Sequence, residues 1–282
     1  MKIVLAEHFG MCFGVRDAIA QAEELAEQAP LIILGELVHN PIVRERLRAQ
    51  GVIEGSLDRP GAKPGQVMIT AHGASDRKRA AWREHGVHVV DGTCPLVRHA
   101  HEQLKRLVAA GYFPIVIGKV GHVEVRGLTE DFPEACVVDL PSDILKLPRR
   151  DRYGVISQTT QPIERVRVLV AEIKRLHPAS EVRFVDTVCK PTKDRQSALR
   201  KLIDVTEIIV VVGGRKSNNT QQLVDTCRAA GRLAFHIERP EELRSEWFDN
   251  ISVVGLTAGT STLRETVEAA FRRLEEIART RP

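Results

Sequence analysis

The chain has 282 residues, of which 43% are hydrophobic and 28% are charged, which is typical of a globular protein. Aromatic residues make up only 4%, so few rings are available for stacking on single-stranded nucleic acid. The formal net charge is +4, and the chain has no dense basic run, so we expect no nucleic-acid partner. A partner that fits this charge is an anionic small molecule or an acidic protein.

The first residues, "KIVLAEHFG", predict a short strand, and we expect no signal peptide. The longest apolar runs, such as "IIVVV" at 208–212, are too short to span a bilayer. We therefore expect a cytoplasmic protein with no membrane partner. The cysteines number five, and this odd count in a cytoplasmic chain indicates ligand or catalytic roles rather than a disulfide framework.

In chain order, short apolar runs alternate with longer amphipathic runs, which is the pattern of an α/β fold. Strands are predicted at 2–6, 31–34, 67–71, 87–90, 114–118, 153–157, 182–186, 207–212, 233–236 and 251–257. Helices are predicted at 15–28, 41–50, 76–85, 96–110, 162–176, 194–204, 219–230 and 262–279.

Three segments repeat one plan of strand, loop, cysteine and helix. They are "KIVLAEHFGMCFGVRDAIAQAEEL", "VHVVDGTCPLVRHAHEQLKRL" and "VRFVDTVCKPTKDRQSALRKL", which carry Cys12, Cys94 and Cys189. Because parallel strands deliver ligands to the loops at their carboxyl ends, we expect these cysteines to meet at one centre. Each could singly be a buried cysteine at a helix start, since Cys94 lies between Thr93, a candidate N-cap, and Pro95.

The spacing of these cysteines bears on the metal that they would hold. Structural zinc usually takes closely spaced pairs such as C-x-x-C, and the chain has no such pair. An iron–sulfur cluster accepts widely separated cysteines, and three thiolates on a [4Fe–4S] cluster would leave one iron open to a substrate oxygen. A zinc-dependent or metal-free phosphate-ester enzyme is a weaker alternative. Cys136 lies in "EACVVDL", a further predicted strand, and Cys227 lies in a helical run. Both fall outside the plan and are interpreted as small buried hydrophobes.

Three histidines also follow predicted strands: His39 in "GELVHNP", His72 in "TAHGAS" and His122 in "GKVGHVEVRG". Protonated imidazoles carry charge and donate from both nitrogens, so three in this kind of location favour an anion site. Two loops that open helices add hydroxyls and amides, namely Ser217, Asn218 and Asn219 in "VVGGRKSNNTQQL" and Ser261 in "GLTAGTSTL". Helix N-termini bind phosphate readily, although plain helix capping would explain the same residues. Together with the histidines, these loops favour a diphosphate-like ligand.

Two further motifs contain candidates for proton transfer. In "GHVEV", an extended segment would point His122 and Glu124 to the same side, so Glu124 is a candidate general acid beside the anion. In "SQTTQP" at 157–162, Thr159 or Thr160 either caps the following helix or relays a proton to a substrate hydroxyl.

These motifs, in this order and over essentially the whole chain, resemble the LytB-type family of 4-hydroxy-3-methylbut-2-enyl diphosphate reductases. The resemblance is carried by "GMCFGVRDAI", "LVHNPIV", "TAHGAS", "DGTCPLV", "GHVEVRG", "SQTTQ", "VVGGRKSNNT" and "GLTAGTST". It implies a trefoil of three α/β domains around a central iron–sulfur cluster. For these domains we expect segments 13–96, 97–192 and 1–12 plus 193–282.

The resemblance also implies roles for residues. Cys12, Cys94 and Cys189 would hold a [4Fe–4S] cluster, and Glu124 would be the proton source beside Thr159, which would hold the substrate hydroxyl. The diphosphate would bind His39, His72, His122, Ser217, Asn218, Asn219 and Ser261. The implied reaction removes an allylic hydroxyl with two electrons and two protons and ends the methylerythritol phosphate route to isoprenoids. A reduced ferredoxin or flavodoxin would supply the electrons. The alternatives are a LytB-like paralogue with another ligand or a cluster-based redox sensor.

Overall fold

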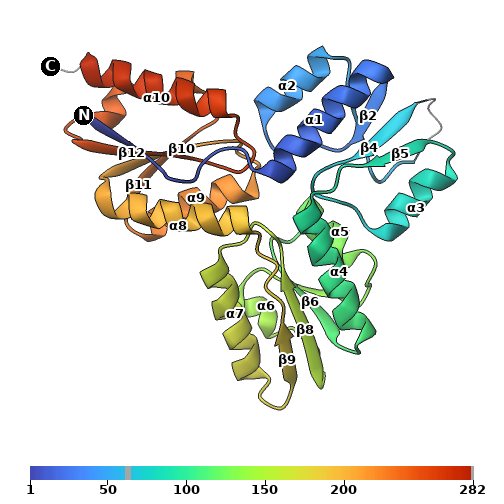
Figure 1. Ribbon diagram of the computed structural model, residues 1–282. Helices are drawn as coiled ribbons and strands as arrows, with labels where there is room; N and C mark the ends of the chain where they lie inside the picture. Colours follow the sequence, from blue (N-terminus) through green and yellow to red (C-terminus); the bar gives the residue numbers. More distant parts are fainter. Residues whose placement is uncertain (61–64, 281–282) are drawn as a thin grey trace. The chain divides into compact units, whose positions relative to one another are not determined.

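In the computed structural model of the chain, the apolar runs are parallel strands and the amphipathic runs are helices between them (Figure 1). The structure describes residues 1–60 and 65–280. Their strands form three separate four-stranded sheets. All registered pairs of strands are parallel, as expected when helices connect successive strands.

Sheet 1 has the strand order β3-β2-β4-β5. Its strands are β2 (Leu31–Leu34), β3 (Ile53–Gly55), β4 (Gln66–Ile69) and β5 (His88–Asp91). The helices that precede or connect them are α1 (Phe13–Gln28), α2 (Pro41–Ala49) and α3 (Asp76–Glu84).

Sheet 2 has the order β7-β6-β8-β9. Its strands are β6 (Phe113–Ile117), β7 (Cys136–Val138), β8 (Arg152–Ser157) and β9 (Glu181–Phe184). Its helices are α4 (Pro95–Ala109), α5 (Val123–Thr129), α6 (Pro141–Ile144) and α7 (Ile163–Leu176).

Sheet 3 has the order β1-β12-β10-β11. Its strands are β1 (Lys2–Leu5), β10 (Ile208–Val212), β11 (Leu233–Ile237) and β12 (Val253–Ala258). Its helices are α8 (Lys190–Val205), α9 (Asn218–Ala229) and α10 (Arg264–Arg279), with short 3₁₀ turns at Pro240–Glu242 and Ser245–Phe248.

The three sheets share one topology. In each, the first strand of the repeat lies between the second and third, and the fourth lies at the edge beside the third. In sheet 3 the fourth place is taken by β1, from the opposite end of the chain. The strand order therefore reverses between the first and third strands of every sheet, and ligands bind at such switch points, outside the carboxyl ends of the strands.

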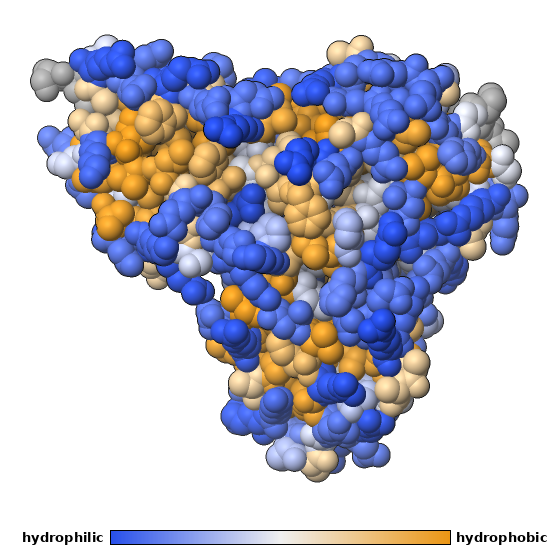
Figure 2. Space-filling view, in the orientation of Figure 1, coloured by the Kyte–Doolittle hydropathy of each residue, from blue (hydrophilic) through white to orange (hydrophobic). Residues whose placement is uncertain are grey.

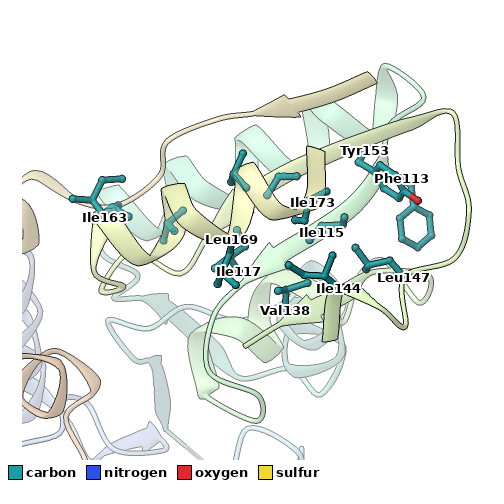
Figure 3. Packing of buried hydrophobic residues seen from close by; sticks show 14 residues of the cluster. Phe113, Ile115, Ile117, Val138, Ile144, Leu147, Tyr153, Ile163, Leu169 and Ile173 are labelled. Atoms are coloured by element: carbon teal, nitrogen blue, oxygen red, sulfur yellow. The ribbon is translucent and has the colours of Figure 1, made fainter. Parts of the chain in front are cut away.

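Each sheet is buried on both faces, as sheet 2 illustrates (Figure 3). Ile115, Ile117 and Tyr153 pack on the face covered by α6 and α7, where Figure 3 shows Leu169 and Ile173 of α7 beside Ile117 and Ile115. Val116 and Ile156, one residue out of phase, pack with α4 and α5 on the opposite face. This double burial explains why the strands read as continuous apolar runs.

The chain separates into two compact units. Unit 1 comprises Met1–Arg16, Val38–Glu45 and Lys190–Pro282 and contains sheet 3, and unit 2 comprises Asp17–Leu37 and Arg46–Cys189 and contains sheets 1 and 2. The strands of each sheet fall inside one of the three predicted segments, whose boundaries remain a prediction. Figure 2 shows hydrophilic residues over most of the visible surface, and no helix within residues 1–60 and 65–280 is long and apolar enough to cross a membrane.

All the predicted strands and helices are present, and their ends lie within four residues of the predicted ends. Apart from the 3₁₀ turns, three short elements were not predicted. β3 and α6 have only three and four residues, too few to show a periodic pattern. The third, α5, begins directly after His122, so the prediction of an extended "GHVEV" segment is wrong. Val123 and Val125 favour strands, and the capping of the helix by His122 outweighs this weak preference.

Candidate active site

The predicted site residues follow the carboxyl ends of the same strands in every repeat. The cysteines follow the fourth strand of each sheet, β5, β9 and β1. The residues predicted to bind an anion or a hydroxyl follow the first and third strands, which flank the switch point. After the first strands come His39, His122 and the group Ser217, Asn218 and Asn219, and after the third strands come His72, Thr159 and Ser261.

A backbone hydrogen bond recurs at the three cysteines. In each repeat the cysteine N–H donates to a carbonyl in the loop that follows the third strand, which is the loop with a predicted substrate residue. The bonds are Cys94 to Ala71 at 3.1 Å, Cys189 to Thr159 at 3.0 Å and Cys12 to Thr260 at 2.9 Å. The three thiol-bearing loops are therefore fixed relative to the switch point of their own sheets. All three side chains are half-buried, reduced thiols.

Cys94 itself, rather than Thr93, stands at the N-cap of α4, and Pro95 opens the helix as predicted. Thr93 is turned away from the helix, because its hydroxyl donates to Asp91 and accepts from Arg79 Nη2 at 3.2 Å. Asp91 also accepts the N–H of Thr93 at 3.1 Å. The polar side chains at this position thus brace the loop and leave the helix N-terminus to the cysteine.

The other two cysteines differ in environment. Cys227 is fully buried, and burial raises the pKa of its thiol to about 12. Cys136 is half-buried rather than fully buried as predicted, and burial raises its pKa as well. Because the thiolate is the metal ligand, these two thiols are poor ligand candidates.

In unit 2, two of the predicted anion ligands meet. The rings of His72 and His122 lie edge to face, with centroids 5.7 Å apart. His122 is the N-cap of α5, and its Nδ1 accepts the N–H of Glu124 at 3.1 Å. Because Nδ1 accepts in this bond, the ring carries its proton on Nε2.

Glu124 lies in the first turn of α5 and is only 2% exposed. Its Oε1 accepts the N–H of Thr159 at 2.7 Å. Burial raises the pKa of this carboxyl from 4.5 to about 7, and hydrogen bonds from the backbone and side chain of Thr159 oppose part of the rise. A carboxyl with this pKa can hold a proton near neutral pH and release it, as a general acid must.

Thr159 connects the acid to a cysteine loop. Its N–H donates to Glu124, and its carbonyl accepts the N–H of Cys189. Neither Thr159 nor Thr160 caps the following helix, because the N-cap of α7 is Pro162. The capping interpretation of these threonines is therefore wrong, which leaves the role in binding a hydroxyl as the prediction for Thr159.

In unit 1, Ser217 is the N-cap of α9, and its hydroxyl accepts the N–H of Thr220 at 3.3 Å. The capping that the sequence suggests is thus present. Asn218 and Asn219 form the first turn and are 3% and 2% exposed. Asn219 Oδ1 accepts the N–H of Thr260 at 3.0 Å, which leaves Nδ2 as a buried donor with no partner among the described residues. A buried, uncompensated amide at a helix N-terminus suits an anionic ligand.

The same unit fastens His39 to the loop that contains Ser261. Asn40 Nδ2 donates to the Ser261 carbonyl at 2.6 Å, and the Ser261 hydroxyl donates to the His39 carbonyl at 3.4 Å. Asn40 also caps α2, since its Oδ1 accepts the N–H of Ile42 at 2.9 Å. Asn40 was missed from sequence, although an asparagine directly before Pro41 at a helix start is a recognisable N-cap signal.

Comparisons with known proteins identify the family of the chain. The sequence model of one family, described as LytB protein, matches residues 3–275. A 4-hydroxy-3-methylbut-2-enyl diphosphate reductase of Aquifex aeolicus is 36% identical, with 98% of this chain and 97% of the relative covered. The corresponding enzyme of Geobacter sulfurreducens is also 36% identical, with 98% of each chain covered.

Two solved structures are similar over most of their length. The E-1-hydroxy-2-methyl-but-2-enyl-4-diphosphate reductase of Plasmodium falciparum superposes with a TM-score of 0.89 at 27% identity, covering 97% of this chain and 87% of the other. A structure of (E)-4-hydroxy-3-methyl-but-2-enyl diphosphate reductase, described as the terminal enzyme of the non-mevalonate pathway, has a TM-score of 0.69 at 34% identity, covering 98% and 99%.

Proposed function

The chain belongs to the LytB protein family, and on this premise we propose that it is a 4-hydroxy-3-methylbut-2-enyl diphosphate reductase, an oxidoreductase of isoprenoid biosynthesis. The reaction breaks the allylic C–O bond of the substrate and consumes two electrons and two protons. Water leaves, and the products are isopentenyl and dimethylallyl diphosphate. At residue level the proposal rests on one arrangement that is repeated in the three sheets. In each sheet the backbone N–H of a cysteine donates a hydrogen bond to the loop beside the switch point.

Cys12, Cys94 and Cys189 are proposed to hold a [4Fe–4S] cluster. The donor set suits such a group, because three reduced and partly exposed thiols follow equivalent strands, and the remaining two thiols are held protonated by burial. When bound, such a cluster would supply electrons and an iron that the three cysteines leave open to a substrate oxygen. The electrons would come from a reduced ferredoxin or flavodoxin in the cytoplasm, where thiols stay reduced.

The diphosphate is proposed to bind at the first and third strand ends. In unit 2 the support comes from the edge-to-face contact between His72 and His122 and from the position of His122 at the N-cap of α5. In unit 1 the support comes from the N-terminus of α9 and the buried Nδ2 of Asn219. The proposed set is completed by His39, Ser217, Asn218 and Ser261.

Glu124 is proposed to donate the proton that leaves with the hydroxyl, and Thr159 to hold that hydroxyl. The support is that Glu124 is buried, that its pKa is about 7, and that Thr159 contacts it directly. A hydroxide is a poor leaving group, so a proton delivered to the oxygen as the C–O bond breaks lowers the barrier.

The test is anaerobic turnover of the allylic diphosphate with a reduced viologen dye. We expect a brown protein that consumes the substrate and forms both C5 diphosphates. A cluster-loaded protein without turnover would reject the proposal and favour a paralogue with another ligand or a redox sensor. A colourless protein with stoichiometric zinc would reject the iron–sulfur assignment itself.

A further inference from the structure

The loop from Gly213 to Ser217 leads from β10 into α9 and ends in the proposed diphosphate ligands. Its first two residues must be glycines. Gly213 has φ +151°, and a Cβ there would lie 2.6 Å from Thr220 Oγ1. A Cβ on Gly214 would lie 2.1 Å from the carbonyl oxygen of His39. The double glycine therefore lets the loop pass close to His39.

Two adjacent glycines also make the loop costly to order, because glycine loses more conformational freedom than any other residue. Three hydrogen bonds from the end of β11 offset this cost. The Gly213 N–H donates to the Ile237 carbonyl at 2.9 Å, and the Gly213 carbonyl accepts from His236 Nε2 at 2.8 Å. The Arg215 N–H donates to Glu238 Oε1 at 2.7 Å.

Sheet 2 provides an internal reference for these contacts. There the Gly118 N–H donates to the Val138 carbonyl at 3.1 Å, and the Val120 N–H donates to Asp139 Oδ2 at 3.4 Å. These bonds correspond to the first and third bonds of sheet 3. The second bond has no counterpart in sheet 2. The next-to-last residue of the first strand pairs with Val137 in sheet 2 and with His236 in sheet 3, and a valine side chain cannot donate a hydrogen bond. The extra bond occurs in the sheet whose loop begins with two adjacent glycines, whereas the two glycines of the sheet 2 loop, Gly118 and Gly121, are separated by two residues.

The His236 ring is suited to this single task. It is half-buried on the edge strand β11, and burial lowers its pKa, so the ring is neutral at pH 7. A carbonyl can only accept, so the ring proton must be on Nε2. We infer that His236 is a positioning residue for diphosphate binding, which fixes the Gly213–Ser217 loop through the Gly213 carbonyl. This inference rests on the proposed function.

The test uses anaerobic, cluster-loaded protein and two variants that separate the ring from the donor. His236→Phe keeps the ring and removes the donor, whereas His236→Gln removes the ring and keeps an N–H donor. Inorganic diphosphate is the probe in calorimetry, and the allylic diphosphate is used for turnover. We expect His236→Phe to weaken diphosphate binding and raise KM by about 2- to 10-fold, the range for one lost hydrogen bond, with kcat nearly unchanged. His236→Gln should restore most of the affinity.

A matched control is His88→Phe, because His88 is an exposed histidine on β5, the edge strand of sheet 1. His236→Val, which copies Val137, serves as a second variant without the donor if the phenylalanine disturbs folding. If wild-type protein binds diphosphate and both donor-less variants bind it equally well, the inference is overturned while the proposed function stands. Equal losses for His88→Phe would also overturn it. A wild-type protein that does not bind diphosphate would overturn the proposed function, and this inference with it.

Discussion

Sheets 2 and 3 build their switch points on the same frame but place different chemistry on it. In sheet 2 the first strand leads to a helix capped by His122, with Glu124 as the second helical residue. In sheet 3 the equivalent helix is capped by Ser217, with Asn219 as the second helical residue. Both caps use a side chain to accept a backbone N–H of the first turn.

The correspondence extends to the bonding partners. The oxygen of Glu124 accepts the N–H of Thr159, and the oxygen of Asn219 accepts the N–H of Thr260. The carbonyls of these threonines in turn accept the N–H groups of Cys189 and Cys12. A path of two hydrogen bonds therefore connects the first helical turn to the cysteine loop in both sheets.

The difference is confined to the side chain that begins this path. A buried carboxyl at that place can exist with or without a proton, whereas an amide cannot titrate and offers its remaining N–H donors to an acceptor. We therefore expect one frame to serve proton transfer in sheet 2 and anion binding in sheet 3.

The largest effect should come from the cysteines that complete the shared frame. Replacing Cys12, Cys94 or Cys189 by serine removes a thiolate ligand, so iron content should fall and turnover should be abolished. Iron analysis and the visible spectrum of anaerobically purified protein check this. The matched controls are Cys136→Ser and Cys227→Ser, which should retain iron near the wild-type level. Equal iron loss in all five variants would contradict the ligand assignment.

The second prediction removes the titrating group from sheet 2. Glu124→Gln gives this sheet an amide like that of Asn219 and keeps an oxygen that can accept the Thr159 N–H. General acid catalysis contributes about 10²–10⁴-fold, so turnover should fall by a factor in that range. Iron content and inorganic diphosphate binding should stay nearly unchanged.

The control for this variant is Glu134→Gln, which changes an exposed glutamate in the turn before β7 and should leave turnover intact. Wild-type turnover in Glu124→Gln would remove Glu124 from the mechanism. Loss of iron or of diphosphate binding would instead identify it as a structural residue.

The third prediction concerns stability and pH. Burial raises the pKa of Glu124 from 4.5 to about 7, so between these values the folded chain holds a proton that the unfolded chain has released. The free energy of unfolding should therefore decrease as pH rises through this window and level off above it, by up to about 3 kcal/mol. Urea unfolding of wild-type and Glu124→Gln protein between pH 4 and pH 8 compares their free energies of unfolding. The decrease in the wild-type protein should end at about pH 7. Parallel curves for the two proteins would show that this carboxyl has an ordinary pKa.

The sequence predicted the repeated strand, cysteine and helix order correctly, because long apolar and amphipathic runs and the positions of glycine and proline depend on local pattern. It did not predict α5. That helix depends on one cap, His122, which reads locally as part of an extended segment. The pKa of Glu124 is raised by burial in the folded chain, which the local sequence does not show. Burial and partners such as Thr159 and Asn40 come from distant parts of the chain and have no local signal.

The smallest expected effect concerns the first residue of α5, Val123. Helices α2 and α4 begin with Pro41 and Pro95, whereas α5 begins with Val123. The N–H at this position has no partner within the helix, and His122 has φ −61° and ψ 139°, which a following proline permits. Val123→Pro should therefore raise the free energy of unfolding by about 0.4–1 kcal/mol relative to Val123→Ala, which corrects for the lost valine side chain. Urea unfolding of both variants measures this, with turnover unchanged. A proline variant less stable than the alanine variant would mean that the His122 cap needs more freedom than the proline allows.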